Sequence, residues 1–130
     1  MPYAIMPYAI MPYGPFKKPF QLIILQVCDI LSDSGSGLRT DFDICVDKGT
    51  YDAISLSSKA NENRPTYRSN VASMLKPKGL FFITSCNWTE AELRAFFSSH
   101  FKVRVVLPTP TFQFGGQTGR NVTSIVFEKE

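Results

Sequence analysis

Residues 42–54 constrain the fold of this chain more than any other stretch. Residues 42–46 are apolar except for Asp43 and suit a short buried strand, which ends at the carboxylate of Asp47. A Lys-Gly-Thr turn follows at once, and a second apolar run then covers residues 51–56. In an open α/β sheet, ligands bind outside the carboxyl ends of the strands. The segment therefore predicts an α/β fold in which Asp47 is a candidate site residue.

Further apolar runs predict four more strands, at residues 22–27, 80–84, 102–107 and 124–128. We expect a helix that has Pro65 in its first turn, where the missing N–H is harmless, and that ends at the Lys-Pro-Lys-Gly stretch of residues 76–79. Thr89 and Glu92 have the spacing of a capping box and predict a second helix. The Gly-Gly pair at residues 115–116 is expected to form a turn. This order predicts parallel strands early in the chain and an antiparallel hairpin at its end.

Residues 1–20 differ in sequence pattern from the rest of the chain. The unit Met-Pro-Tyr-Ala-Ile occurs twice and is followed by Met-Pro-Tyr-Gly. Pro at every fifth position prevents both a continuous helix and a central strand. We therefore expect residues 1–20 to be a low-complexity, disordered segment and residues 21–130 to form one domain.

Size, charge and cysteine use exclude several classes of protein. A chain of 130 residues fits one domain, and its net charge of +3 comes from scattered Lys and Arg rather than from a nucleic-acid-binding face. The longest apolar run, residues 22–25, is far too short to cross a bilayer. Cys28, Cys45 and Cys86 lie in or just after apolar runs, so we expect reduced interior thiols in a cytoplasmic, or also nuclear, protein. With one His and no C-x-x-C pair, no metal site is expected.

Three of the predicted strands end in polar residues: Asp29, Asp47, and the pair Asn87 and Trp88. If these strands are parallel neighbours, the three groups lie along one edge of the sheet and form a site. A carboxylate there can accept hydrogen bonds from a nucleoside, and an aromatic ring can stack on a base or cover a cation. Each residue also has a purely structural interpretation. Asp29 can cap a turn, Asp47 with Lys48 can form a solvated turn, and Trp88 can pack in the core.

Four segments together resemble one family: residues 43–54, 75–79, 83–89 and 107–116. They are similar to the seven-stranded S-adenosylmethionine-dependent methyltransferases, and within that class to the lysine methyltransferases of elongation factor 1-alpha. The Asp-Lys-Gly-Thr motif is fairly specific to this group, whereas Leu-Lys-Pro-x-Gly is common across the wider class. The resemblance runs from about Gln26 to the end of the chain. It implies the C-terminal part of a Rossmann-like methyltransferase sheet.

The resemblance also implies roles for the residues at the strand ends. Asp29 would contact the adenine amino group of S-adenosylmethionine, and the Ile30 backbone would face the adenine ring. Asp47 would be the catalytic carboxylate, close to both the methyl donor and the incoming lysine amine. The substrate side would consist of four residues: Lys48, Gly49, Asn87 and Trp88.

The chain departs from the family pattern before residue 22. The family's first strands and Gly-rich loop should lie there, but residues 1–28 contain no Asp/Glu-x-Gly-x-Gly sequence. We therefore expect a truncated methyltransferase that binds S-adenosylmethionine poorly and methylates elongation factor 1-alpha weakly or not at all. The alternative is a non-catalytic form that keeps the substrate-side surface and binds a partner protein.

Overall fold

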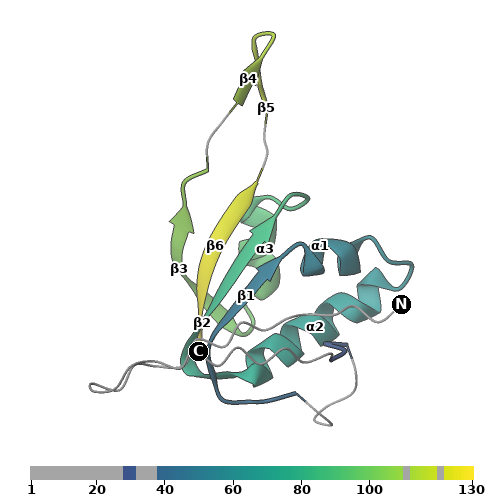
Figure 1. Ribbon diagram of the computed structural model, residues 1–130, viewed down its shortest axis with the longest axis vertical. Helices are drawn as coiled ribbons and strands as arrows, with labels where there is room; N and C mark the ends of the chain where they lie inside the picture. The colour runs from purple at the N-terminus through teal and green to yellow at the C-terminus, as the bar shows by residue number, and fades with distance from the viewer. Residues whose placement is uncertain (1–27, 32–37, 110–111, 120–121) are drawn as a thin grey trace, which may run out of the picture.

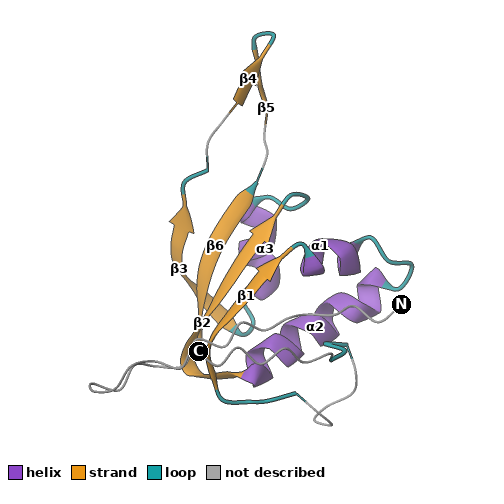
Figure 2. Cartoon of the chain, in the orientation of Figure 1, coloured by secondary structure: helices purple, strands orange, loops and turns teal. Residues whose placement is uncertain are grey.

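The computed structural model describes residues 28–31, 38–109, 112–119 and 122–130. The expected N-terminal segment and the expected strand at residues 22–27 lie outside these described residues. The described part contains a four-stranded sheet, three helices and a separate two-stranded hairpin (Figures 1 and 2). This is the mixed α/β architecture that the sequence predicts.

The sheet has the strand order β1-β2-β6-β3, with these bounds: β1 Phe42–Lys48, β2 Leu75–Ser85, β6 Thr123–Lys129 and β3 Phe101–Leu107. Strands β1 and β2 are parallel, and β6 is antiparallel to both of its neighbours. The expected parallel start and antiparallel end are therefore confirmed. Strand β1 extends to Lys48, so Asp47 and Lys48 belong to the strand and not to a solvated turn.

The helices are α1 (Thr50–Ser55), α2 (Ala60–Met74) and α3 (Glu90–Phe97). The expectation that Pro65 occupies the first turn of its helix is wrong, because α2 begins five residues earlier. Proline is tolerated at this position because its missing N–H frees only the carbonyl of Asn61, in the exposed first turn, where water can hydrogen-bond to it.

A bulge, rather than a simple helix-ending turn, follows α2. Leu75 pairs with the first residue of β1 and Leu80 pairs only two residues further along β1, so the residues between them leave the ladder. Helix α2 does end before residues 76–79, but these residues belong to β2. A Cβ atom on Gly79 would lie 2.8 Å from the carbonyl oxygen of Lys76. Glycine is therefore required for the close approach inside the bulge.

An aromatic core joins the three helices to one face of the sheet. Phe81 of β2 contacts Phe97 of α3, with 5.4 Å between the ring centroids, and Phe127 of β6 packs against both rings. Tyr51 of α1 lies 5.5 Å from Tyr67 of α2, and it also packs edge-on against Phe97. On the opposite face the sheet is more open, since Val46 and Val105 each keep 45% of their surface exposed. The core thus fixes the helices that surround the carboxyl end of β1.

The hairpin consists of β4 (Phe112–Phe114) and β5 (Gln117–Gly119) and extends beyond the sheet in Figure 1. Its turn contains Gly115 and Gly116 at φ 57° and 81°, so the expected Gly-Gly turn is confirmed. These left-handed conformations suit glycine at both positions.

The three cysteines are free thiols in different surroundings. Cys45 is buried, Cys28 is half-buried and Cys86 is exposed, so the expectation of interior thiols holds only for Cys45. Burial raises the pKa of the Cys45 thiol to about 12. Cys86 lies outside the core because it follows the last residue of β2, where the chain turns at the surface.

The described ranges contain neither a candidate membrane-spanning helix nor a candidate metal site. None of the helices there has the length and apolar character needed to cross a membrane. In the same residues, no three or more His, Cys, Asp or Glu side chains are grouped so that they could hold a metal ion.

Candidate functional site

The carboxyl ends of β1 and β2 lie side by side at one edge of the sheet. In the parallel ladder Asp47 pairs with Ile83, and Lys48 pairs with Thr84. Asp47 is thereby brought next to the turn that follows β2, which contains Asn87. The predicted convergence of these two strand ends is confirmed.

Asp47 anchors the start of α1. Its side chain is 5% exposed, and its two oxygens accept the backbone N–H groups of Thr50 at 2.8 Å and Tyr51 at 3.0 Å. Gly49 makes this possible because its φ of 95° reverses the chain between the strand and the helix. Lys48, between them, is exposed.

A third hydrogen bond reaches Asp47 from α2, where the Tyr67 hydroxyl donates to Oδ2. Burial raises the pKa of the Asp47 carboxyl above its ordinary value, while the hydrogen bonds from Tyr67 and from the backbone oppose this shift. Burial and the nearby carboxylate raise the pKa of Tyr67 well above its ordinary value, so the hydroxyl stays protonated and donates. Tyr67 is a site residue that the sequence reasoning missed.

Asp52 is a second buried carboxylate that was not predicted. It is 8% exposed, and it accepts the Ser85 hydroxyl at 2.5 Å and the backbone N–H of Cys86 at 2.8 Å. The Ser85 oxygen in turn accepts the N–H groups of Asn87 at 3.1 Å and Trp88 at 3.0 Å. This network fixes the turn after β2 against α1. A charged residue inside the apolar run 51–56 was the signal that could have identified Asp52.

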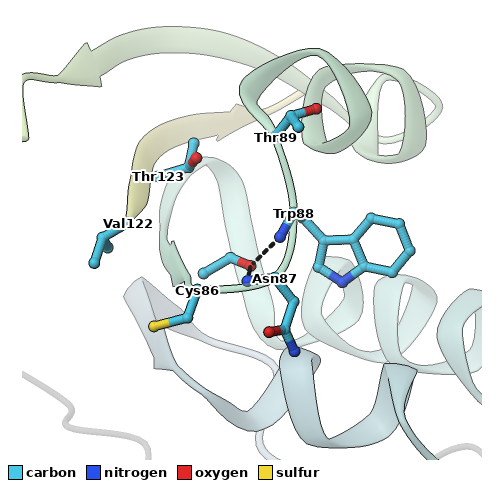
Figure 3. Close-up of a pocket in the computed structure, with 7 residues that line it drawn as sticks. Cys86, Asn87, Trp88, Thr89, Val122 and Thr123 are labelled. Atoms are coloured by element: carbon cyan, nitrogen blue, oxygen red, sulfur yellow. Dashed lines mark hydrogen bonds between the residues drawn. The ribbon is translucent and has the colours of Figure 1, made fainter. Parts of the chain in front are cut away.

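Trp88 packs inward, as its structural interpretation predicts. Its indole N–H donates to the Ser55 hydroxyl at 3.2 Å, and the Arg64 guanidinium lies 4.3 Å from its ring centroid. Arg64 also donates two hydrogen bonds, of 2.9 and 2.8 Å, to the Tyr51 hydroxyl. Figure 3 shows the indole turned away from Val122 at the start of β6. The ring therefore joins the turn to α1 and α2, and Trp88 is also one of the residues that line the cavity described next.

A cavity of about 60 Å³ lies at this edge, lined by the turn after β2 and by the start of β6 (Figure 3): Ser85, Cys86, Asn87, Trp88, Thr89, Val122 and Thr123. The predicted capping box is confirmed at its far side. The Thr89 hydroxyl accepts the Glu92 N–H at 3.1 Å, and the Glu92 carboxylate accepts the Thr89 N–H at 2.8 Å. This exchange starts α3 and holds one wall of the cavity in place.

The segment around Asp29 packs against α2. Asp29 is exposed and its carboxylate accepts the Leu31 N–H at 2.9 Å, which is the turn-capping geometry. Ile30 is buried, and its carbonyl accepts a hydrogen bond of 2.6 Å from the Asn70 amide. Ile30 and Asp47 both line a second, apolar cavity of about 20 Å³. The structure thus places Ile30 close to Asp47.

Neither cavity has the size that a nucleoside ligand needs. Pockets for small molecules usually measure about 300–1,000 Å³, compared with about 60 and 20 Å³ here. Both oxygens of Asp47 are also engaged by groups of the chain itself. Neither of these two cavities by itself has room for S-adenosylmethionine. The ligand contacts that the family resemblance implies stay predictions, for these residues: Asp29, Ile30, Asp47, Lys48, Gly49, Asn87 and Trp88.

Comparison with curated proteins gives clear relatives. The chain is 47% identical over 114 residues to EEF1A lysine methyltransferase 2 of Mus musculus, with 87% of this chain and 46% of that protein covered. It is 44% identical over 107 residues to protein-lysine N-methyltransferase efm4 of Schizosaccharomyces pombe, with 79% of this chain and 44% of that protein covered. The chain thus spans less than half the length of these relatives. No protein-family model matches it.

Solved structures with the same fold are methyltransferases. A TehB-like SAM-dependent methyltransferase from Corynebacterium glutamicum has a TM-score of 0.57 at 20% identity, with 81% of this chain and 55% of that chain covered. The 1,6-didemethyltoxoflavin-N1-methyltransferase of Burkholderia thailandensis, solved with bound S-adenosylhomocysteine, has a TM-score of 0.55 at 20% identity, with 78% of this chain and 48% of that chain covered. The chain is thus a relative of the EEF1A lysine methyltransferase 2 proteins over less than half of their length, with the fold of SAM-dependent methyltransferases.

Proposed function

We propose that this chain provides the substrate side of an S-adenosylmethionine-dependent protein-lysine N-methyltransferase, with elongation factor 1-alpha as its protein substrate. The observation that carries the proposal is the cavity of about 60 Å³ at the carboxyl ends of the strands. It suits the end of one side chain rather than a nucleotide. The 47% identity to the mouse EEF1A lysine methyltransferase 2 supports lysine as that side chain.

The charges at the sheet edge support a cationic substrate group. Asp47 and Asp52 are buried carboxylates at the carboxyl end of β1 and in the first turn of α1. They do not line the cavity, but Asp52 accepts a hydrogen bond from Ser85, which does. A nearby carboxylate stabilises an ammonium group in its charged form. This attraction is stronger when the carboxylate is buried, because the protein interior screens charges less than water does. The chain's own part in the reaction is to hold the turn of Asn87 and Trp88 in place, through Asp52 and Ser85, so that an incoming lysine meets a fixed surface.

The chain alone is expected to bind S-adenosylmethionine weakly and to transfer methyl groups slowly or not at all. Support comes from the small cavity beside Ile30 and from the occupied oxygens of Asp47. Isothermal titration of the full chain with S-adenosylmethionine tests this expectation. Low-micromolar affinity would contradict it.

Methyl transfer is tested with tritiated S-adenosylmethionine and purified elongation factor 1-alpha. Mouse EEF1A lysine methyltransferase 2 serves as a positive control. Incorporation by this chain at a rate close to that of the control would show a complete active site and overturn the expectation of weak activity.

The second candidate function is non-catalytic binding of a partner protein. It is favoured by the same hydrogen bonds, which engage Asp47 within the chain. Capture of elongation factor 1-alpha without methyl incorporation would support this candidate, and no capture would count against it. Asn87→Ala is the informative variant because Asn87 is exposed and lines the cavity. Asn61→Ala, on the exposed start of α2, is the matched control.

A further inference from the structure

Two arginines of α2 stack on aromatic rings beside the candidate site. The Arg64 guanidinium lies 4.3 Å from the ring centroid of Trp88 and 4.6 Å from that of Phe96. One turn further along α2, the Arg68 guanidinium lies 4.5 Å from the centroid of the same Phe96 ring. These four residues form what we call the arginine–aromatic cluster, and one of them, Trp88, also lines the cavity.

The positive charges of the cluster are not neutralised within the part of the chain that the structure describes. The ion pairs found there are formed by other cations: Arg39, Lys76, Arg94, Lys102 and Arg104. Like charges four residues apart on a helix repel each other and destabilise it. An anion bound close to Arg64 and Arg68 would relieve this repulsion.

Both arginines keep N–H donors that no described residue accepts. Arg64 donates from Nε and Nη2 to the Tyr51 hydroxyl, and its Nη1 has no acceptor among the described residues. Arg68 donates from Nη1 to the Phe96 carbonyl at 2.7 Å, which leaves Nε and Nη2 without an acceptor in the same ranges. Of these three nitrogens only the Nε of Arg68 is fully buried. A ligand at the surface can therefore reach one donor nitrogen of each arginine.

We propose that the arginine–aromatic cluster binds the carboxylate of an Asp or Glu side chain on the protein whose lysine enters the cavity. The inference rests on the proposed function, because it assigns a second contact to the same protein substrate. A carboxylate is the anion that an unmodified protein surface carries, and its two oxygens match the N–H groups of a guanidinium.

The aromatic rings prepare the cluster for this contact. Stacking on Trp88 and Phe96 holds the two guanidiniums in place before the substrate arrives, so little side-chain freedom is lost on binding. Because Arg64 contacts a residue that lines the cavity, the carboxylate and the lysine bind next to each other. The site thus selects a substrate surface that carries an acidic residue close to the target lysine.

The test measures binding of purified elongation factor 1-alpha to the immobilised full chain by biolayer interferometry over a range of salt concentrations. Arg68→Gln removes a charge of the cluster without touching Trp88, and Arg68→Lys keeps the charge but loses the planar fork. Arg94→Gln is the matched control, because it removes the same charge from an arginine that already pairs with Glu90 at 2.7 Å. The unfolding temperature and the Trp88 emission of each variant show whether the fold and the turn are kept.

We expect Arg68→Gln to bind on the order of tenfold more weakly, as for the loss of a hydrogen bond between charged groups, and with a smaller dependence on salt. Arg68→Lys should have an intermediate affinity, and Arg94→Gln should bind as the unaltered chain does. Equal binding by Arg68→Gln and Arg94→Gln would overturn the carboxylate site and leave the proposed function standing.

Weaker binding by Arg68→Gln with an unchanged salt dependence would also overturn the carboxylate site, because it would show a role in packing rather than in charge recognition. Absence of saturable binding by the unaltered chain would contradict the proposed function and the carboxylate site together.

Discussion

Removing the Tyr67 hydroxyl tests whether Asp47 is held as a buried carboxylate. Tyr67→Phe deletes one donor to Asp47 Oδ2 and leaves the ring, which packs against Tyr51 and Phe81, in place. The two backbone donors to Asp47 remain. A hydrogen bond to a charged group contributes about 1.5–3 kcal/mol, so we expect the free energy of unfolding to fall by about 2 kcal/mol at neutral pH.

The loss should depend on pH in a defined direction. Burial already places the pKa of folded Asp47 above its ordinary value, and the Tyr67 hydrogen bond opposes that shift. The variant therefore has a still higher folded pKa, and ionised Asp47 destabilises its folded state more. As the pH falls from neutral through the folded pKa to below the ordinary Asp range, Asp47 becomes protonated. The loss should then shrink to about 1 kcal/mol, which is typical of a neutral hydrogen bond.

The assay is urea unfolding followed by the fluorescence of Trp88, the single tryptophan of the chain. A loss of about 2 kcal/mol shifts the midpoint by roughly 1 M urea for a small domain. Tyr51→Phe is the control, because the Tyr51 hydroxyl contacts Arg64 and not the carboxylate. The loss of unfolding free energy caused by Tyr51→Phe should not become smaller at acid pH. A change below about 0.5 kcal/mol for Tyr67→Phe, or a loss that is the same at all pH values, would refute the reasoning.

Three further predictions concern packing around the site. Gly79→Ala should lower the free energy of unfolding by about 1–3 kcal/mol, since its Cβ would lie 2.8 Å from a backbone oxygen, and an unchanged urea midpoint would contradict the bulge geometry. Arg64→Ala should shift the tryptophan emission to longer wavelength and increase its quenching by acrylamide, because the Arg64 guanidinium covers the indole ring. Arg68→Ala should leave the emission wavelength and the quenching unchanged, because the Arg68 guanidinium stacks on Phe96 instead. Thr89→Ala should cost about 1 kcal/mol in urea unfolding through loss of the helix cap, whereas Thr66→Ala, within α2, should stay within about 0.5 kcal/mol.

The parts of the site that depend on local sequence were predictable. The capping box of Thr89 and Glu92 uses residues three apart, so spacing alone identifies it. The meeting of Asp47 with the turn after β2 follows from parallel neighbouring strands, which the order of strands and helices predicts. Residues 80–84 predict a central strand because their first four residues are all apolar, and β2, to which they belong, does lie between β1 and β6.

The contacts between distant residues were not predictable from the sequence. Asp52 meets Ser85 across 33 positions and Tyr67 meets Asp47 across 20, and no local pattern records such pairs. The start of α2 was missed for a different reason. Its first turns are largely exposed and polar, so the apolar periodicity that marks a helix begins only at Tyr67, well after Ala60.

The most direct test of the proposed substrate side is the binding of elongation factor 1-alpha to the unaltered chain, measured beside Asn87→Ala and Asn61→Ala. The account predicts saturable binding that Asn87→Ala weakens and Asn61→Ala does not, because Asn87 lines the cavity at the carboxyl edge and Asn61 does not. Absence of saturable binding, or equal binding by all three proteins, would contradict the assignment of this edge to a lysine-bearing substrate.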